Sequence, residues 1–255
     1  MTLKFYPASH RYKLDGAWVP GVTTILGVLD KSRPLSKWAA ESVATYVADN
    51  PAGVEELRNM GRGSMVHALK EIPWDATRKA QDRGTEFHTY AEKIAGGEEV
   101  DVPEHMVPLV EQALDFMDKF DIRPVLIEAA VASREHRYAG KLDLVADSNR
   151  GRCIFDWKSG KRIYPTTAFQ LAAYAGAEFT GLDGAEHPLP DVEGSFGVHI
   201  RADGWDAYPL TFGPAVFGEF VNIRRTFDIH KRAEGNWKVP GTGYVGLSVQ
   251  EESLV

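Results

Sequence analysis

The stretch that constrains the fold most runs over 138–160 and reads YAGKLDLVADSNRGRCIFDWKSG. Two largely apolar runs, about 138–146 and about 152–158, flank a turn-forming segment at 148–151. This pattern predicts two antiparallel strands joined by a short turn. Such a hairpin decides which polar side chains of the chain meet on one side of a sheet.

Side chains alternate between the two faces of a strand, so residues two positions apart share a face. Asp156 and Lys158 therefore point the same way, while Trp157 points oppositely, into the core. On the preceding strand, Lys141 and Asp143 share a face. Because the strands are antiparallel neighbours, we expect two carboxylates and an ammonium to converge at one point of the sheet.

A divalent cation explains such a cluster better than stability does, because buried ion pairs often fail to recover their desolvation cost. Oxygen ligands suit Mg²⁺ or Mn²⁺, which would lower the pKa of a bound water and neutralise a phosphate. Lys158 would orient that water or stabilise developing negative charge. A surface hairpin with scattered charges is the alternative. This alternative accounts well for an isolated D-x-K tripeptide, which is common. It accounts poorly for the full order of G-x-x-D on one strand, D-x-K on the next and then a helix.

An alanine-rich segment, about 166–179, follows the hairpin and is predicted to be a helix capped by Thr166 or Thr167. Gln170 and Tyr174 stand four residues apart and share a face of it. An amide and a phenol beside a metal site can bind a phosphate or a base edge. A half-buried helix face explains the same pair without a ligand.

Upstream, the segment RGTEFHTYAE lies in a predicted helix over 75–95. His88 and Glu92 share one of its faces, next to an apolar stripe. A lone histidine at such a boundary is usually structural. His67 is a second candidate for the histidine and ranks below His88.

The remaining patterns predict how the chain is organised. Helices are expected over about 104–120 and 214–233, and strands over about 125–132, 195–201 and 206–212. This order indicates an α/β fold with a mixed central sheet flanked by helices. We expect three parts. These are an N-terminal extension of short strands and helices packed on the core (1–74), the core (75–235) and a C-terminal tail (236–255).

The segments GTEFHTYAE, AGKLD, DWKSG and QLAAY together resemble the PD-(D/E)XK nuclease superfamily, and within it the RecB-like branch, which includes phage-encoded exonucleases. The patterns are G-x-x-x-H, G-x-x-D, D-x-K and Q-x-x-x-Y, in this order, over about 80–180. The resemblance implies a restriction-endonuclease-like αβββαβ core. It also implies a Mg²⁺- or Mn²⁺-dependent deoxyribonuclease.

The resemblance also assigns roles to individual residues. The implied metal ligands are His88, Asp143, Asp156 and the main-chain carbonyl of Trp157. Lys158 would be catalytic together with the two aspartates, and the implied DNA contacts are Gln170, Tyr174 and Lys141. Glu92 and Glu128 are expected in supporting roles, and Glu128 would support the site or the substrate without ligating the metal.

Composition limits these expectations. The net charge of −7 argues against a nucleic-acid coat that works through overall positive charge, but not against a nuclease with local basic residues. Cys153 is the one cysteine, so the four-cysteine iron–sulfur cluster of a CRISPR-associated relative cannot form. No apolar run approaches the roughly 18 residues of a membrane helix, and the first residues do not resemble a signal peptide.

DNA is therefore the expected partner, with no membrane involved, in the cytoplasm, or in the host cytoplasm if the chain is phage-encoded. An exonuclease in phage DNA recombination, repair or processing is the first hypothesis. A structure-selective endonuclease or nickase on the same site is the second. A catalytically silent DNA-binding module is the third. The sequence leaves open a homo-oligomer and a recombination-protein partner.

Overall fold

A seven-stranded mixed sheet forms the centre of the computed structural model, which describes residues 3–29, 32–182 and 184–238. Its strands are β4 (Arg123–Ser133), β5 (Tyr138–Ser148), β6 (Gly151–Lys158), β7 (Phe179–Leu182), β8 (Ala185–His187), β9 (Gly194–Arg201) and β10 (Gly204–Pro209). Their order is β10-β9-β6-β5-β4-β7-β8. The neighbours β6 and β9 run parallel, and the other paired strands of this sheet run antiparallel.

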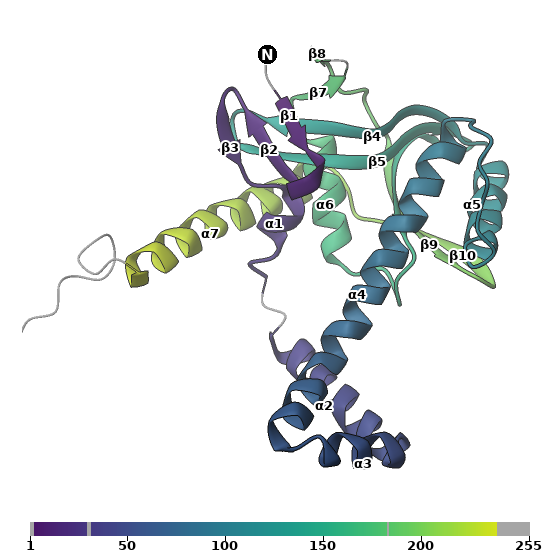
Figure 1. The fold of residues 1–255 in the computed structure, drawn as a ribbon. Coiled ribbons are helices and arrows are strands. Elements are labelled where there is room, and N and C mark those ends of the chain that lie inside the picture. The colour runs from purple at the N-terminus through teal and green to yellow at the C-terminus, as the bar shows by residue number, and fades with distance from the viewer. Residues whose placement is uncertain (1–2, 30–31, 183, 239–255) are drawn as a thin grey trace, which may run out of the picture.

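Helices cover both faces of the sheet (Figure 1). On one face lie α1 (Val22–Leu26), α6 (Thr166–Ala175) and α7 (Pro214–Lys238), which share a core with β4, β5 and β6. On the other face lie α4 (Arg62–Ala95) and α5 (Val107–Lys119), whose apolar side chains meet those of β5, β6 and β9. The predicted α/β architecture with a mixed central sheet is confirmed.

A small second sheet begins the chain. It consists of β1 (Leu3–Tyr6), β2 (Arg11–Leu14) and β3 (Ala17–Val19), with the short 3-10 helix η1 (Pro7–Ser9) between the first two. A turn at Asp15-Gly16 joins β2 to β3, and both residues have positive φ, 48° and 82°. The inner face of the small sheet is buried against β4, β5 and β7. This part of the N-terminal extension is packed on the core.

The rest of the extension projects from the core. Helices α2 (Ser32–Asp49) and α3 (Pro51–Asn59) lie at the far end of α4, away from the large sheet (Figure 1). The predicted helix start at residue 75 is wrong, because α4 begins at Arg62 and continues through Pro73. Asp75 does not cap a helix; it forms an ion pair with Arg78 one turn further on. The boundary expected between 74 and 75 therefore falls inside one helix.

Several other predicted bounds are corrected. Helix α6 ends at Ala175 instead of 179, because Phe179 pairs with Ala132 and begins an unpredicted strand. Its N-cap is Pro165, and neither threonine caps it through a side chain. The expected tail over 236–255 starts later, because α7 runs to Lys238; residues 239–255 lie outside the described residues. None of the described helices has the length and apolar character needed to cross a membrane.

Candidate metal centre

The site forms where the β5–β6 ladder opens. The paired register runs from Ser148–Gly151 to Leu144–Phe155 and stops there. At the next position, Asp143 and Asp156 follow on the same face as the facing pair Val145 and Ile154. The Trp157 N–H donates to the Asp143 carboxylate, 2.8 Å from N to Oδ2, instead of to a backbone carbonyl of β5. The convergence predicted from strand alternation is present.

Glu128 brings a further carboxylate to this point from β4. The ladder between β4 and β5 pairs Ile127 with Leu144 and Ala129 with Leu142, so Glu128 falls opposite Asp143. Its φ of 47° is left-handed, a conformation that costs a non-glycine residue roughly 1–3 kcal/mol. Such strain is concentrated at functional sites, and here it accompanies a carboxylate beside Asp143.

Helix α4 supplies the histidine. The Nδ1 atom of His88 lies 3.5 Å from Asp143 Oδ2, and the side chain is 30% exposed. The preceding residue, Phe87, is fully buried against the β5–β6 face and holds the helix at this height. Burial and then the charge of Lys158 lower the pKa of His88. A neutral imidazole is the form that ligates a metal.

Potential ligand atoms of His88, Glu128 and Asp143 all lie within 4.8 Å of one another. This group differs from the set implied by the resemblance, because it includes Glu128 and does not include Asp156. Burial raises the pKa of Glu128, and Asp143 raises it further against the opposing effect of Lys141. Burial and then Asp156 likewise raise the pKa of Asp143. The protein thus holds carboxylates close together at an electrostatic cost.

Asp156 has a separate set of contacts. Its side chain is 1% exposed, and Oδ1 accepts a hydrogen bond from Gln170 Nε2 at 3.0 Å. Oδ2 forms an ion pair with the Lys158 ammonium but accepts no well-oriented hydrogen bond. The Lys158 side chain is 31% exposed. Burial disfavours its charge, but Asp156 and Asp143 outweigh burial and raise the pKa of Lys158.

The Gln170 and Tyr174 side chains from α6 complete this region. Gln170 Nε2 lies 3.2 Å from the Tyr174 hydroxyl as well as contacting Asp156. A Cβ atom at Gly140 would stand 3.0 Å from Tyr174 Cδ1 and closer still to Cε1. The glycine of G-x-x-D is therefore where the tyrosine ring of Q-x-x-x-Y packs. In this structure Gln170 positions Asp156, and its contact with DNA stays a prediction.

The structure places the other predicted residues as follows. Lys141 forms an ion pair with Glu128, so its ammonium is engaged beside the cluster. Glu92 is exposed, and no hydrogen bond or ion pair joins it to the cluster within the described part of the chain. His67 is exposed on α4, about 30 Å from His88 at roughly 1.5 Å per residue. The Trp157 ring is buried, and its main chain contacts His88 and Asp143.

The donor set fits a divalent cation. Carboxylate oxygens suit Mg²⁺ and Mn²⁺, and imidazole is accepted by transition metals. The buried Asp156 Oδ2, which lacks a well-oriented donor, is a further acceptor at the edge of the group. From the sequence, Glu128 was expected to support the site without ligating the metal, and its role stays a prediction. The available signal was its register position opposite Asp143.

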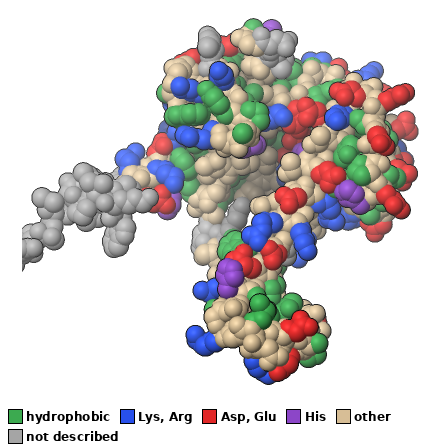
Figure 2. All heavy atoms as spheres, viewed as in Figure 1, with side chains coloured by type: hydrophobic (Ala, Val, Ile, Leu, Met, Phe, Trp, Pro, Cys, Tyr) green, Lys and Arg blue, Asp and Glu red, His purple; other side chains and the backbone are tan. Residues whose placement is uncertain are grey.

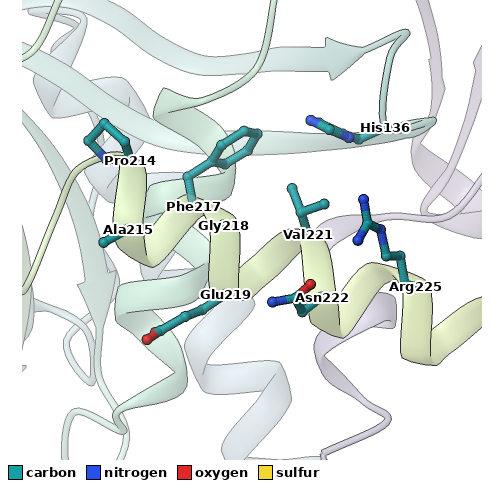
Figure 3. Close-up of a pocket in the computed structure, with 9 residues that line it drawn as sticks. All are labelled: His136, Pro214, Ala215, Phe217, Gly218, Glu219, Val221, Asn222 and Arg225. Atoms are coloured by element: carbon teal, nitrogen blue, oxygen red, sulfur yellow. The ribbon is translucent and has the colours of Figure 1, made fainter.

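A separate hollow lies on the other side of α6, along α7. It has a volume of about 570 Å³ and is lined by one turn after another of α7, with His136 opposite (Figure 3). Its lining includes Glu219 and Arg225. It includes none of His88, Glu128, Asp143 and Asp156, which we call the acidic cluster. Among the described residues, the group of three potential metal ligands lies at the opened end of the β5–β6 ladder and apart from this hollow.

No family model matches this chain, and a search of curated proteins found no match. The functional interpretation therefore depends on the geometry of the site and on the spacing of its four motifs.

Proposed function

We propose that this protein is a metal-dependent nuclease that hydrolyses DNA phosphodiester bonds. The observation that carries the proposal is one juxtaposition. The ligand atoms of His88, Glu128 and Asp143 lie within 4.8 Å of one another, and the Asp156–Lys158 ion pair adjoins them. Because the four motifs resemble those of phage-encoded exonucleases, we expect cleavage from DNA ends.

His88, Glu128 and Asp143 would hold the cation. When bound, a divalent cation neutralises phosphate charge and lowers the pKa of a water molecule. Lys158 provides a fixed positive charge where negative charge develops on a phosphate. Asp156 forms an ion pair with the Lys158 ammonium, and Gln170 donates a hydrogen bond to Asp156. Contacts within the protein therefore fix the position of the ammonium.

The proposed chemistry would also account for a group of charges whose burial is otherwise unfavourable. Buried ionic groups contribute little to stability, and removing one partner leaves the other unpaired. The left-handed Glu128 adds backbone strain at the same place. Binding of a phosphoryl substrate and a divalent cation would use all of these groups at once. A purely structural role would leave the buried charges and the backbone strain uncompensated.

The test uses the full chain with Mn²⁺ or Mg²⁺ on three substrates: linear duplex, linear single strand and closed circular duplex. We expect release of nucleotides from linear DNA, none from closed circles, and no cleavage with excess chelator. Nicking of circles would support the endonuclease alternative. Cleavage that persists in chelator, or no cleavage of any substrate with either metal, would contradict the proposal.

A further inference from the structure

The outer face of the β1–β3 sheet carries a second group of polar side chains. These side chains are less buried than those of the metal centre. Strand alternation and register place Lys4, Tyr6, Arg11, Lys13 and Trp18 on this face. We call these five residues the N-terminal platform. The alternate residues of the same strands, including Tyr12 and Leu14, face the core. The platform is therefore a single surface of three cations and two aromatic rings.

The platform side chains form one contiguous layer. The Arg11 guanidinium lies 4.0 Å from the centroid of the Trp18 ring, and the Tyr6 and Trp18 ring centroids are 5.1 Å apart. Lys4 Nζ lies 5.6 Å from the Tyr6 ring, and Lys13 Nζ lies 5.6 Å from the Trp18 ring. In Figure 2, basic and apolar side chains gather over these strands. Trp18 remains 48% exposed.

The three cations have no carboxylate partner among the described residues, whereas many other basic residues do. Arg134 pairs with Asp15 and Glu186, and Arg152 pairs with Asp147. An uncompensated basic surface on a chain of net charge −7 is complementary to a polyanion. The exposed Trp18 ring and the half-buried Tyr6 ring beside the cations add flat surfaces on which unpaired bases can stack.

We propose that the N-terminal platform binds single-stranded DNA, with Trp18 and Tyr6 stacking on bases and Lys4, Arg11 and Lys13 contacting phosphates. A duplex hides its base faces, so it can use the cations but not the rings. This combination of a basic surface with exposed rings is typical of sequence-tolerant single-strand binding.

The small sheet that carries the platform contacts the surroundings of the metal centre through its opposite, inner face. Phe5, on the inner face of the small sheet, has its ring 5.9 Å from Lys141 Nζ, and Lys141 pairs with Glu128. The backbone of the small sheet, the Phe5 ring and the Lys141 side chain thus lie in turn between the platform and Glu128. A role in guiding a strand toward the cluster rests on the proposed nuclease function. Binding by the platform does not.

The test measures binding of a labelled oligothymidine by fluorescence anisotropy, in excess chelator so that cleavage plays no part. Trp18→Ala should weaken binding about ten-fold. Exchanging Lys4, Arg11 and Lys13 for glutamine should lower the slope of log affinity against log salt by about 2, at roughly 0.7 for each phosphate contact. Lys119→Gln is the matched control, because Lys119 also lies beside a tryptophan ring but is paired with Asp115.

Unchanged binding in both platform variants, with thermal unfolding like the parent, would overturn the proposal. So would equal affinity for duplex and single strand, or competition by polyglutamate as effective as that by oligothymidine. Binding that depends on the platform in a chain without cleavage activity would leave this inference standing and count against the proposed nuclease function alone.

Discussion

The two faces of the β5–β6 hairpin are built from alternate residues of the same strands, yet they have opposite chemistry. On one face Leu144, Phe155 and Trp157 pack against α4 and α5 in an aromatic core. On the other face Asp143 and Asp156 lie with Lys158 among partly buried polar groups. Residues adjacent in sequence therefore have different roles, one in core packing and the other in the polar site. Neighbouring substitutions should then alter stability and chemistry separately.

The largest effect is expected on the polar face, from Asp156→Asn. This change keeps the shape of the side chain and an acceptor for Gln170 but removes the charge that holds Lys158. We expect DNA cleavage with Mn²⁺ to fall about a thousand-fold, roughly 4 kcal/mol of activation free energy. The free energy of unfolding should change by less than about 1 kcal/mol, because the Lys158 ammonium left behind is 31% exposed and still near Asp143, and the repulsion between Asp156 and Asp143 is removed.

Cleavage rates on linear DNA and urea unfolding of the same preparation check both halves of this prediction. Parental activity in Asp156→Asn would remove Asp156 from the proposed chemistry. An unfolded variant would mean that the polar face is needed for stability, and the contrast between the two faces would fail.

The converse effect is expected one residue away. Trp157 is buried, and its ring contacts those of Phe87 and Phe116 edge to face. Trp157→Ala should lower the free energy of unfolding by about 3–5 kcal/mol, because a large aromatic side chain leaves a cavity. Urea unfolding measures this loss. The same substitution at the exposed Trp18 is the control and should change stability far less; equal effects would contradict the assigned core.

A smaller effect on the free energy of unfolding is expected where Gly140 of G-x-x-D packs against Tyr174 of Q-x-x-x-Y. In Gly140→Ala the new methyl group overlaps the Tyr174 ring. Overpacking of this kind costs about 1–3 kcal/mol of unfolding free energy. The penalty should shrink in a chain that also carries Tyr174→Ala, and a double-mutant cycle measures the difference. Gly84→Ala is the control. Its nearest neighbour is Ser159 Oγ at 3.8 Å, so the methyl group fits there.

The smallest effect is expected on metal affinity, and it tests whether Glu128 is a metal ligand. Glu128→Gln should weaken Mn²⁺ binding about ten-fold, roughly 1.4 kcal/mol, because Glu128 lies in the group of close ligand atoms. Calorimetric titration of Mn²⁺ without DNA measures the dissociation constant. Glu92→Gln, one helical turn beyond His88, should leave it unchanged. Equal affinities in all three proteins would return Glu128 to the supporting role expected from the sequence alone.

Much of the site was predictable because strand alternation is a local property. The positions of Asp143, Asp156 and Lys158 on one face, and of Trp157 on the other, follow from a period of two and a short turn. The nearness of Gln170 to Tyr174 follows in the same way from helix periodicity. The turn at Asp15-Gly16 was also predictable, since few residue pairs accept positive φ at both positions.

Other features of the site were not predictable from local pattern. Glu128 reaches the cluster through a left-handed backbone on a strand that pairs in register with β5. Lys141 is engaged by that same carboxylate. The start of α4 at Arg62 was missed because Pro73 and Asp75 are typical of a helix start, whereas here they lie inside one long helix. Contacts with α2 and α3 accompany this first half of α4.

The sequence by itself determined the hairpin, the face on which its charges lie and the spacing of the motifs, because each depends on the geometry of a few consecutive residues. Only the tertiary structure decided which charges touch, which carboxylates lie close together and which cations of the described residues have no carboxylate partner. Those outcomes depend on distances between residues from separate strands and helices, and such distances exist only once the sheet and its covering helices have packed together.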